Sequence, residues 1–551
     1  VVDRQKKRWH LDLVQMPNLP EPLSMADVQV AQLEKMTARE RQVLQIAAVI
    51  GWVFWETAVV ELAQSVIRSL SLPEIEAALQ TLERMQIIYR RRTSLLSGVP
   101  EFSFRHDSLQ VVAYGQIDPV LRQRLHEQAA SWYATAQREG HDFTGTIAHH
   151  YAAADNAQQA AKWYVSAAET AVDHYGPETA ISHYKQAIAW LRRVEQDPDT
   201  GPLTYERLQM HGGLGRMLLW RARLDEAVAI FKQMLALARR HDDQAQIHEA
   251  ALGLFICFDF QGSREQTAHY ARLALDSGRL AEDPGLTCIG LAAVAWAQMR
   301  LGEWDAAEKT AETAVAASAE ALSPLGMAYS NMVLGNLYRL MTRFEAASQH
   351  LEKAIMLLRQ NGERKWEGMA TMQLGHVARD ERDYALACQR YENSLRIARE
   401  LSDQMGIILA LQNLGQSYQH QAQFEKADQY LRQVLLLAEK CHCVVHLAYI
   451  AYLLGELHRL QYAQADSLVD ELARQAHWEQ AQTWFNRAIE QDERLPMSRG
   501  PLLAHLGMAR LLLADGRPQD ALAIVQPIVE RIAAETETGS MPSLLHRSDM
   551  A

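Results

Sequence analysis

Small and apolar residues recur along much of this 551-residue chain with a period of 40. The segment 334–355 reads LGNLYRLMTRFEAASQHLEKAI, and segments of the same pattern begin at Leu374 and Leu414. The recurring positions are Gly215, Gly335, Gly375, Gly415 and Gly455 (with Ala295 and Phe255 in register), then Leu224, Trp304, Phe344, Tyr384 and Phe424, then Ala227, Ala307, Ala347, Ala387 and Ala427. The polar positions between them change freely from one repeat to the next.

A period of this length, with helical spacing inside it, predicts one helical hairpin in each repeat. Gly or Ala at the recurring sites lets neighbouring helices approach closely. We expect the aromatic residue after the turn to fill the gap between the two helices. One hairpin cannot bury its apolar face alone, so the hairpins should stack into an all-α solenoid.

This pattern resembles the tetratricopeptide repeat (TPR) over roughly residues 205–535. The usual repeat has about 34 residues, so a 40-residue repeat implies longer helices. The longer form is similar to the superhelical sensor domain of the maltose-regulon transcriptional activator. The resemblance therefore implies a right-handed superhelix of helical hairpins. The sequence departs from the pattern after Gly455, where an insertion delays the next aromatic residue to Trp478, and in the last unit, which has Gly507, a turn at 516–518 and Ala521. The unit centred on Phe255 is also irregular.

The region before the array has a different pattern. Residues 131–204 have helical spacing and are interpreted as degenerate repeats. Within 28–130 we predict three helices around 28–50, 56–69 and 74–86, the third starting near Ser71 and Pro73. Two alternating runs, IIYRRR at 87–92 and EFSFRH at 101–106, predict a β-hairpin after them. Helices followed by a hairpin predict a small winged-helix domain.

The segments LQIAAVIGWVFW, FRHD and LHEQAA, in this order and ahead of helical repeats, resemble the STAND class of signal-transduction ATPases. The adenylate-cyclase-linked and LuxR-type regulators fit best. The resemblance implies that the chain is the C-terminal part of such a protein and that residues 1–27 are the tail of an upstream ATPase domain. ATP and Mg²⁺ are then expected only in that upstream domain. Residues 536–551, rich in Ser, Thr, Gly and Pro, are expected to be a disordered tail.

Composition narrows the function classes. The net charge of −12 and the pI of about 6.0 disfavour nucleic acid or an anionic membrane as the main partner. No apolar run approaches the roughly 18 residues that a membrane helix needs. Five cysteines provide no disulfide framework, so a reducing, cytoplasmic location is expected. Cys441, Cys443 and His446 could bind a metal, but buried thiols are the favoured reading, and no metal site is predicted. Neighbouring His149 and His150 are likewise read as packed or solvated.

The sequence has none of three common nucleotide-binding or catalytic motifs. There is no Gly-Lys dipeptide and hence no P-loop, and neither HExxH nor G-x-S-x-G occurs. We therefore predict that this chain is not an enzyme and holds no cofactor of its own. Arg90, Arg91 and Arg92 on the predicted wing could contact DNA phosphates. Exposure, or a contact with the ATPase domain, is the favoured interpretation because the third helix is acidic.

The candidate site comes from the TPR resemblance, which implies that the helix carrying the glycine lines an inner groove. Its inward residues fall one and four positions after the glycine and form two polar columns: Asn336, Arg339, His376, Arg379, Gln416, Gln419, Glu456 and Arg459. Trp296 and Met299 occupy the same positions upstream and add an apolar end. Arginine can hold carboxylate or phosphate in a bidentate fork, and amides suit peptide groups.

The sequence thus predicts a sensor and protein-interaction module. Its partner would be a protein, a peptide or a small-molecule effector, and binding would be transmitted to the upstream ATPase domain in cis. Two alternatives remain open: a protein-assembly scaffold without an effector, and a transcriptional regulator that reads DNA through the winged helix.

Overall fold

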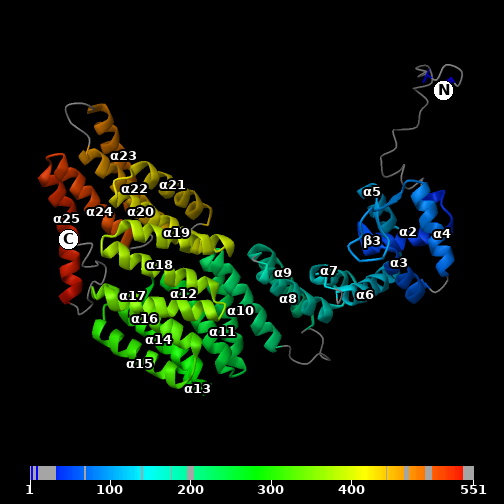
Figure 1. Cartoon of the computed structure of the whole chain (residues 1–551), viewed down its shortest axis with the longest axis horizontal. Helices are drawn as coiled ribbons and strands as arrows, with labels where there is room; N and C mark the ends of the chain where they lie inside the picture. The colour runs from blue at the N-terminus through cyan, green and yellow to red at the C-terminus, as the bar shows by residue number, and fades with distance from the viewer. Residues whose placement is uncertain are drawn as a thin grey trace. The chain divides into compact units, whose positions relative to one another are not determined.

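The computed structural model describes residues 2–3, 8–9, 33–67, 70–137, 140–174, 176–194, 204–441, 444–464, 471–490 and 499–537. The chain divides into two compact units (Figure 1). The first comprises Val1–Thr170 and Gln186–Pro202, and the second comprises Ala171–Lys185 and Leu203–Ala551. Most of the predicted tail 1–27, and residues 538–551 of the predicted disordered end, lie outside the described residues. Within 1–27, the short strands β1 (Val2–Asp3) and β2 (Arg8–Trp9) pair antiparallel.

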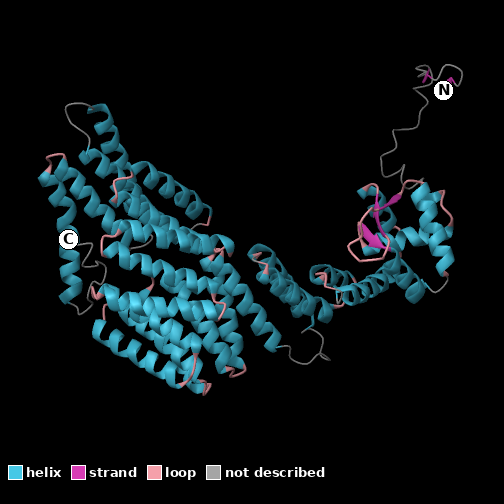
Figure 2. Ribbon diagram, in the orientation of Figure 1, coloured by secondary structure: helices cyan, strands magenta, loops and turns pink. Residues whose placement is uncertain are grey.

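The first unit opens with three helices and a small sheet. They are α2 (Ala38–Ile50), β3 (Val53–Trp55), α3 (Glu56–Leu62) with a π-helical turn η2 (Ala63–Ile67), α4 (Leu72–Arg84), β4 (Ile88–Arg90) and β5 (Glu101–Phe104). The predicted hairpin is present, since β4 pairs antiparallel with β5. A third strand, β3, was not predicted; it pairs with the other side of β5, which puts β5 in the centre (Figure 2). The hairpin therefore joins a three-stranded sheet.

Local capping sets the helix starts in this unit. Thr37 and Glu40 form a capping box at α2, and Ser71 and Glu74 form one at α4. Each box pairs a hydroxyl and a carboxylate with backbone N–H groups that the first turn leaves free. Four further helices follow: α5 (Asp107–Gly115), α6 (Pro119–Ala136), α7 (Thr144–Ala153) and α8 (Ala157–Asp173). The next helix, α9 (Pro177–Val194), is divided, with its residues up to Lys185 assigned to the second unit. Trp55, Trp132, Tyr133 and Phe143 form an aromatic cluster that joins the sheet to α6 and α7.

The second unit is a TPR-like solenoid. Its helices are α10 (Thr204–Trp220), α11 (Leu224–Arg240), α12 (Gln244–Phe260), α13 (Arg264–Leu280), α14 (Pro284–Leu301), α15 (Trp304–Glu320), α16 (Pro324–Leu340), α17 (Phe344–Gln360), α18 (Arg364–Asp380), α19 (Tyr384–Glu400), α20 (Gln404–His420), α21 (Phe424–Lys440), α22 (Val444–Gln464), α23 (Glu471–Ile489), α24 (Arg499–Ala514) and α25 (Pro518–Glu537). From α11 to α22 every helix begins 20 residues after the one before. The 40-residue period is therefore two helices of nearly equal length joined by three-residue turns.

The turns share one backbone conformation, which the sequence analysis did not predict. The second turn residue has positive φ in each case, at Ala222, Asp242, Gly262, Glu282, Gly302, Leu322, Thr342, Gly362, Arg382, Ser402 and Ala422. The N–H of Asp403 then bonds to the carbonyl of Ala398 at 2.8 Å, and that of Ser402 to Arg399 at 3.1 Å. This is the Schellman pattern, which satisfies the last carbonyls of the helix. Eight of these eleven residues are not glycine, so local composition did not reveal the motif.

The recurring glycines lie at helix contacts, as predicted. A Cβ added at Gly335 would lie 2.7 Å from Leu351 Cγ, and Cβ atoms at Gly215, Gly375, Gly415 and Gly455 would come equally close to a side chain of the partner helix. Ala307, Ala347, Ala387 and Ala427 are fully buried. The side chains that face the glycines lie 16 residues after Gly215, Gly335, Gly375 and Gly415: Phe231, Leu351, Tyr391 and Leu431.

One detail of the predicted packing is wrong. The residues nine after the glycine are not the ones that face it, because that place is occupied by side chains seven residues, or about two helical turns, further into the outer helix. Trp304 is 39% exposed, and Phe344, Tyr384 and Phe424 are half-buried at the start of their helices. Phe344 and Phe424 still pack, as partly buried residues, against the apolar cores of the array.

The even-numbered helices form the inner layer of the solenoid. Each contacts the next even-numbered helix, from α10 to α24, and α10 also contacts α20. Five hairpins therefore complete one superhelical turn, so that the start of the array touches a later part of it. As a result α16, α18 and α20 have almost no exposed residues, whereas the outer helices keep one polar face.

Candidate functional site

The ten predicted site residues all lie in the C-terminal halves of inner helices. Trp296 and Met299 are on α14, Asn336 and Arg339 on α16, His376 and Arg379 on α18, Gln416 and Gln419 on α20, and Glu456 and Arg459 on α22. Met299, Asn336, Arg339, Gln419 and Glu456 are buried, and the other five are half-buried. The columns are therefore less accessible than an open groove would make them.

Five side chains from three inner helices form a continuous polar chain, named here the arginine chain: Asn336, Arg339, Asp380, Arg379 and Gln416. Arg339 Nε donates to Asn336 Oδ1 at 3.1 Å, and its Nη1 donates to Asp380 Oδ2. Arg379 donates to Asp380 Oδ1 from Nε (3.1 Å) and Nη2 (3.0 Å) and to Gln416 Oε1 at 3.3 Å. The sequence analysis missed Asp380, because it considered only positions one and four after the glycine.

The arginine chain has two guanidinium groups and one carboxylate, and therefore one positive charge in excess. Burial alone would raise the pKa of Asp380, but the guanidinium groups of Arg379 and Arg339 outweigh it and hold that pKa below its usual range. Burial lowers the pKa of Arg339, and Asp380 offsets part of this effect. Two arginines thus share one carboxylate in a largely buried setting, where an unneutralised charge is costly.

The remaining predicted residues form separate contacts. Gln419 Nε2 donates to the carbonyl of Leu453 at 2.5 Å, which joins α20 to α22. Glu456 and Arg459 form an ion pair at 2.9 Å within α22. His376 Nδ1 lies 2.8 Å from the hydroxyl of Tyr391. Their role in binding stays a prediction.

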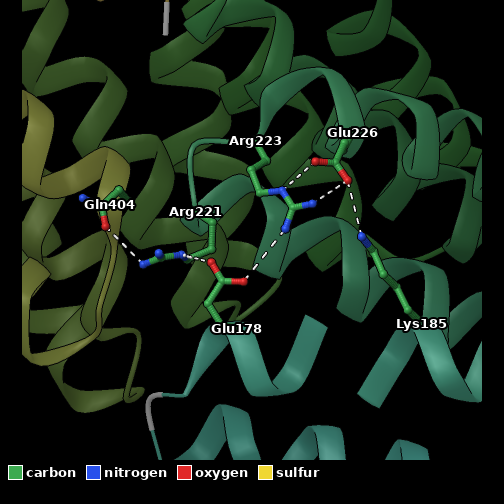
Figure 3. A network of polar contacts seen from close by, with 6 residues as sticks. All are labelled: Glu178, Lys185, Arg221, Arg223, Glu226 and Gln404. Carbon is green, nitrogen blue, oxygen red and sulfur yellow. Dashed lines mark hydrogen bonds and ion pairs between the residues drawn. The ribbon is translucent and has the colours of Figure 1, made fainter. Parts of the chain in front are cut away.

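A second polar network, named here the seam, lies where the superhelical turn closes (Figure 3). Arg221, in the turn after α10, donates to Glu178 of α9 at 2.7 Å and to Gln404 of α20 at 3.1 Å. Arg223 binds Glu226 with two hydrogen bonds of 2.6 and 2.7 Å. Lys185 reaches Glu226 at 3.4 Å, and Arg223 lies 3.9 Å from Glu178. Through the bond between Arg221 and Gln404, the seam links residues that are 183 positions apart in the sequence.

The seam continues into the interior beside Lys365 of α18. Its Nζ lies 3.6 Å from Asp403 Oδ1 and 5.2 Å from the centre of the Trp220 ring. Burial lowers the pKa of Lys365, and Asp403 counteracts this. Ala222, Leu224 and Phe260 pack into the apolar core of α18–α22 at the same place. The first hairpins of the array therefore cover part of the inner surface of the later ones.

The first unit contains a buried histidine pair that the sequence analysis treated only in part. His149 is exposed, but His150 faces His126, with the two Nδ1 atoms 2.9 Å apart, and Tyr114 bonds to His126 Nε2 at 2.8 Å. Burial is the main cause that lowers the pKa of His126 to about 4 and that of His150 to about 3. Both imidazoles are thus neutral near neutral pH, which explains how they can lie side by side in a core.

Across the parts of the chain that the structure describes, no three His, Cys, Asp or Glu side chains come together as metal ligands would. Cys443 lies outside those parts, so the Cys441–His446 segment is untested as a metal site. Within the same described ranges, no helix is both long and apolar enough to cross a bilayer.

Models of the tetratricopeptide repeat match three parts of the chain: residues 212–241, 328–361 and 368–440. The matched segments fall in the 40-residue array, so the array is a protein-interaction module built of tetratricopeptide repeats. None of the matched models describes an enzyme. No curated protein sequence matches the chain.

Several solved structures are similar in fold. A Rap protein complexed with competence and sporulation factor is 14% identical, with a TM-score of 0.41 over 66% of this chain and 99% of that one. A STAND protein with a tetratricopeptide repeat sensor from Pyrococcus horikoshii is 11% identical, with a TM-score of 0.38 over 94% and 67%. The human IFIT1 dimer with m7Gppp-AAAA is 17% identical, with a TM-score of 0.37 over 61% and 71%. Sequence identities and TM-scores this low say nothing about the function of this chain.

Proposed function

We propose that the chain is the sensor part of a STAND-type signalling ATPase and that the inner layer of its superhelix binds an acidic segment of a protein or peptide. The observation that carries this proposal is the arginine chain. Arg339 and Arg379 share the single carboxylate of Asp380 and lie beside the amides of Asn336 and Gln416.

A ligand carboxylate would supply the missing negative charge and could accept two parallel hydrogen bonds from a guanidinium group. Arg379 is the better candidate for this contact, because its side chain is 19% exposed whereas that of Arg339 is 9% exposed. The neighbouring amides could bond to peptide groups. The proposed partner is therefore a peptide or protein segment with acidic side chains.

The proposal assigns residues 28–130 to a winged helix that connects the sensor to an upstream nucleotide-binding domain. The order helix, strand, two helices and hairpin, with the hairpin completing a three-stranded sheet, supports this assignment. The proposed coupling requires that the partner bind two arrangements of the sensor with different affinity. The seam is a candidate for the element that changes, since it holds the superhelical turn closed.

The DNA-binding alternative receives less support. Arg91, the central arginine of the predicted wing, forms an ion pair with the buried carboxylate of Glu101 at 2.6 Å. Its guanidinium group is thus engaged within the domain rather than free for phosphate. We further propose a cytoplasmic location, which the free cysteines Cys257, Cys288, Cys388 and Cys441 favour.

The test is a selection of random dodecapeptides on the full chain, followed by fluorescence anisotropy with one enriched peptide. We expect acidic sequences to be enriched and Arg379→Gln to weaken binding at least tenfold, since hydrogen bonds to charged groups contribute roughly 1.5–3 kcal/mol. Arg396→Gln is the matched control, because Arg396 pairs with Glu400 on the exposed face of α19. Enrichment of sequences without acidic residues, or equal binding by both variants, would reject the inner site.

The scaffold alternative predicts a different outcome. A scaffold would bind its partner through a large surface and would not depend on one arginine. A peptide that binds Arg379→Gln as tightly as the unmodified chain, and competes with a folded partner protein, would therefore favour it.

A further inference from the structure

One position in the array distinguishes a single repeat from its neighbours. Three residues after the recurring glycine, the inner helices carry Tyr338, Ala378, Tyr418 and His458. Each ring packs against a ring of the following outer helix: Tyr338 against His350, Tyr418 against Tyr430 and His458 against His477, with centroids 5.5, 5.5 and 5.6 Å apart. Only the repeat with Ala378 lacks a ring at this position among these four.

The two tyrosines make a second contact in common. Tyr338 donates its hydroxyl hydrogen to Glu312 at 3.5 Å, and Tyr418 donates to Glu392 at 3.3 Å. Both glutamates lie on the preceding outer helix, 26 residues before the tyrosine. A phenol in this position therefore joins two outer helices through one carboxylate and one ring contact.

In the repeat between them, both partners of the phenol are present but the phenol is missing. Glu352 corresponds to Glu312 and Glu392, and Arg390 corresponds to His350 and Tyr430. Within the described parts of the chain, neither side chain has a hydrogen-bond or ion-pair partner, and Arg390 Nε is buried without one. Ala378 is buried and has only a methyl group, so it supplies neither the ring nor the hydroxyl of Tyr338 and Tyr418.

Glu352 and Arg390 both line an open hollow of about 360 Å³ between α17, α18 and α19. It is lined by Glu352, Ile355, Met356, Arg359, Gln360, Leu374 and Arg390. Leu374 lies one helical turn before Ala378, on the same side of α18. An engineered cavity of about 150 Å³ is large enough to bind benzene, so this hollow has room for an aromatic ring and its substituent.

We propose that this hollow, named here the phenol hollow, binds a phenolic ring supplied from outside the chain. The ring lies over the guanidinium of Arg390, where a cation–π contact is favourable, and against Ile355, Met356 and Leu374. Its hydroxyl donates to Glu352, as Tyr338 and Tyr418 donate to the corresponding glutamates. The hollow is on the outer helices, so it is separate from the arginine chain of the proposed function.

The charges of the hollow select this chemistry over others. An aromatic acid would bring its carboxylate close to Glu352, and an aromatic amine would bring its ammonium group close to Arg390. A neutral ring with one hydrogen-bond donor satisfies both groups without repulsion. A plain hydrocarbon ring would make no hydrogen bond to Glu352, whose exposed carboxylate would stay hydrated, so it would gain less on binding.

The test is an NMR titration of the full chain with p-cresol, the side-chain analogue of tyrosine, and with toluene. We expect p-cresol to bind at least tenfold more tightly than toluene and Glu352→Gln to remove most of this difference. Ala378→Tyr supplies the missing phenol within the chain and should abolish p-cresol binding. Equal binding of p-cresol and toluene, or p-cresol binding that survives Ala378→Tyr, would overturn the proposal.

A gain of binding gives an independent check. Tyr418→Ala should open a second hollow beside Glu392 and Tyr430 and raise the number of p-cresol molecules bound from one to two. If a folded Tyr418→Ala protein still bound only one p-cresol molecule, positions 378 and 418 would not be equivalent, and the proposal would be contradicted. The Glu352→Gln measurement does not depend on that variant, because Glu352 is exposed and its replacement leaves the packing intact.

The source of the phenol can be distinguished in the same assay. A peptide with one central tyrosine that binds more tightly than p-cresol, and loses this on Tyr→Phe replacement, would indicate a partner protein. p-Cresol binding without any gain from the peptide would indicate a small phenolic metabolite. Arg379→Gln should change neither result, so failure of the arginine-chain proposal and failure of this one can be told apart.

Discussion

The main buried polar clusters of the two units differ in charge. In the first unit the buried His126 and His150 are neutral, and they lie against the rings of Tyr114 and Tyr133. The solenoid has buried pairs of opposite charge, in the arginine chain and in Lys365 with Asp403, as well as single buried histidines such as His248. The first unit has a single core, whereas the solenoid repeats one contact along its length.

The difference follows from how each unit is built. A compact core with long-range contacts can surround an uncharged polar pair with aromatic rings on all sides. In the solenoid, the C-terminal ends of successive inner helices lie side by side. Their polar side chains therefore contact one another from helix to helix, and opposite charges pair. Protons should therefore destabilise the first unit, and loss of a counter-charge should destabilise the second.

The largest effect is expected from Asp380→Ala. This substitution leaves Arg339 and Arg379 buried without a carboxylate, and breaking a buried ion pair costs about 3–5 kcal/mol. Hydrogen exchange measured by mass spectrometry should show faster exchange in α16–α20, with no change in residues 38–136. Asp520→Ala, which removes the exposed pair with Arg517, should cost less than about 1 kcal/mol. Similar effects of the two variants would contradict the role given to Asp380.

Lowering the pH should destabilise the first unit more than α16–α20 of the solenoid. The pKa values of His126 and His150, about 4 and about 3, lie below the unfolded value of about 6.5, so the unfolded state binds more protons below pH 6.5. Stability is complete above that pH and declines as pH falls towards the folded values. The neighbouring charges of Arg122 and His149 disfavour protonation further. We expect a loss of roughly 2 kcal/mol for each imidazole by pH 5.

The measurement is hydrogen exchange at pH 7 and pH 5, corrected for the intrinsic rate and compared between the two units. Peptides from α6 and α7 should lose more protection than peptides from α16–α20. His149→Ala is the control, since His149 is exposed and its removal should leave the acid sensitivity largely in place. If α16–α20 lost protection before α6 and α7, the histidine pair would not be the more acid-sensitive element.

A smaller effect is expected when a glycine of the solenoid gains a side chain. Gly335→Val would place a methyl-bearing carbon near Leu351 Cγ (2.7 Å) and the Ala347 carbonyl oxygen (3.0 Å). Overpacking of this kind costs about 1–3 kcal/mol. Gly115→Val in the first unit is the matched control, because a Cβ there meets nothing within 4 Å. Urea denaturation should show destabilisation only for Gly335→Val, and an equal effect at Gly115 would weaken the stacking argument.

The smallest effect should be a gain of stability at a solenoid turn. Leu322 has φ of 49° and is 85% exposed, so it has backbone strain and little packing. Leu322→Gly removes a strain of about 1–2 kcal/mol and adds a backbone entropy cost of about 0.5–1 kcal/mol. Thermal unfolding should show a net gain of about 0.5 kcal/mol. Leu436→Gly, exposed within α21, should instead lose about 1 kcal/mol.

The sequence by itself determined the local architecture. The 40-residue period located the hairpins, Gly335, Gly375 and Gly415 marked the helix contacts, and alternating residues located the hairpin of β4 and β5. These features depend on neighbours within one or two helices, and such contacts leave a periodic pattern in the residues that make them. The inner helices that hold the predicted columns were identified for the same reason.

Only the tertiary structure decided how the solenoid closes and which polar groups meet. The contact between α10 and α20 results from small rotations added over five hairpins, so neither Arg221 nor Gln404 shows it locally. Asp380 became part of the arginine chain because the ends of α16 and α18 lie side by side. The phenol hollow depends on Ala378, whose meaning appears only when its repeat is compared in space with those of Tyr338 and Tyr418.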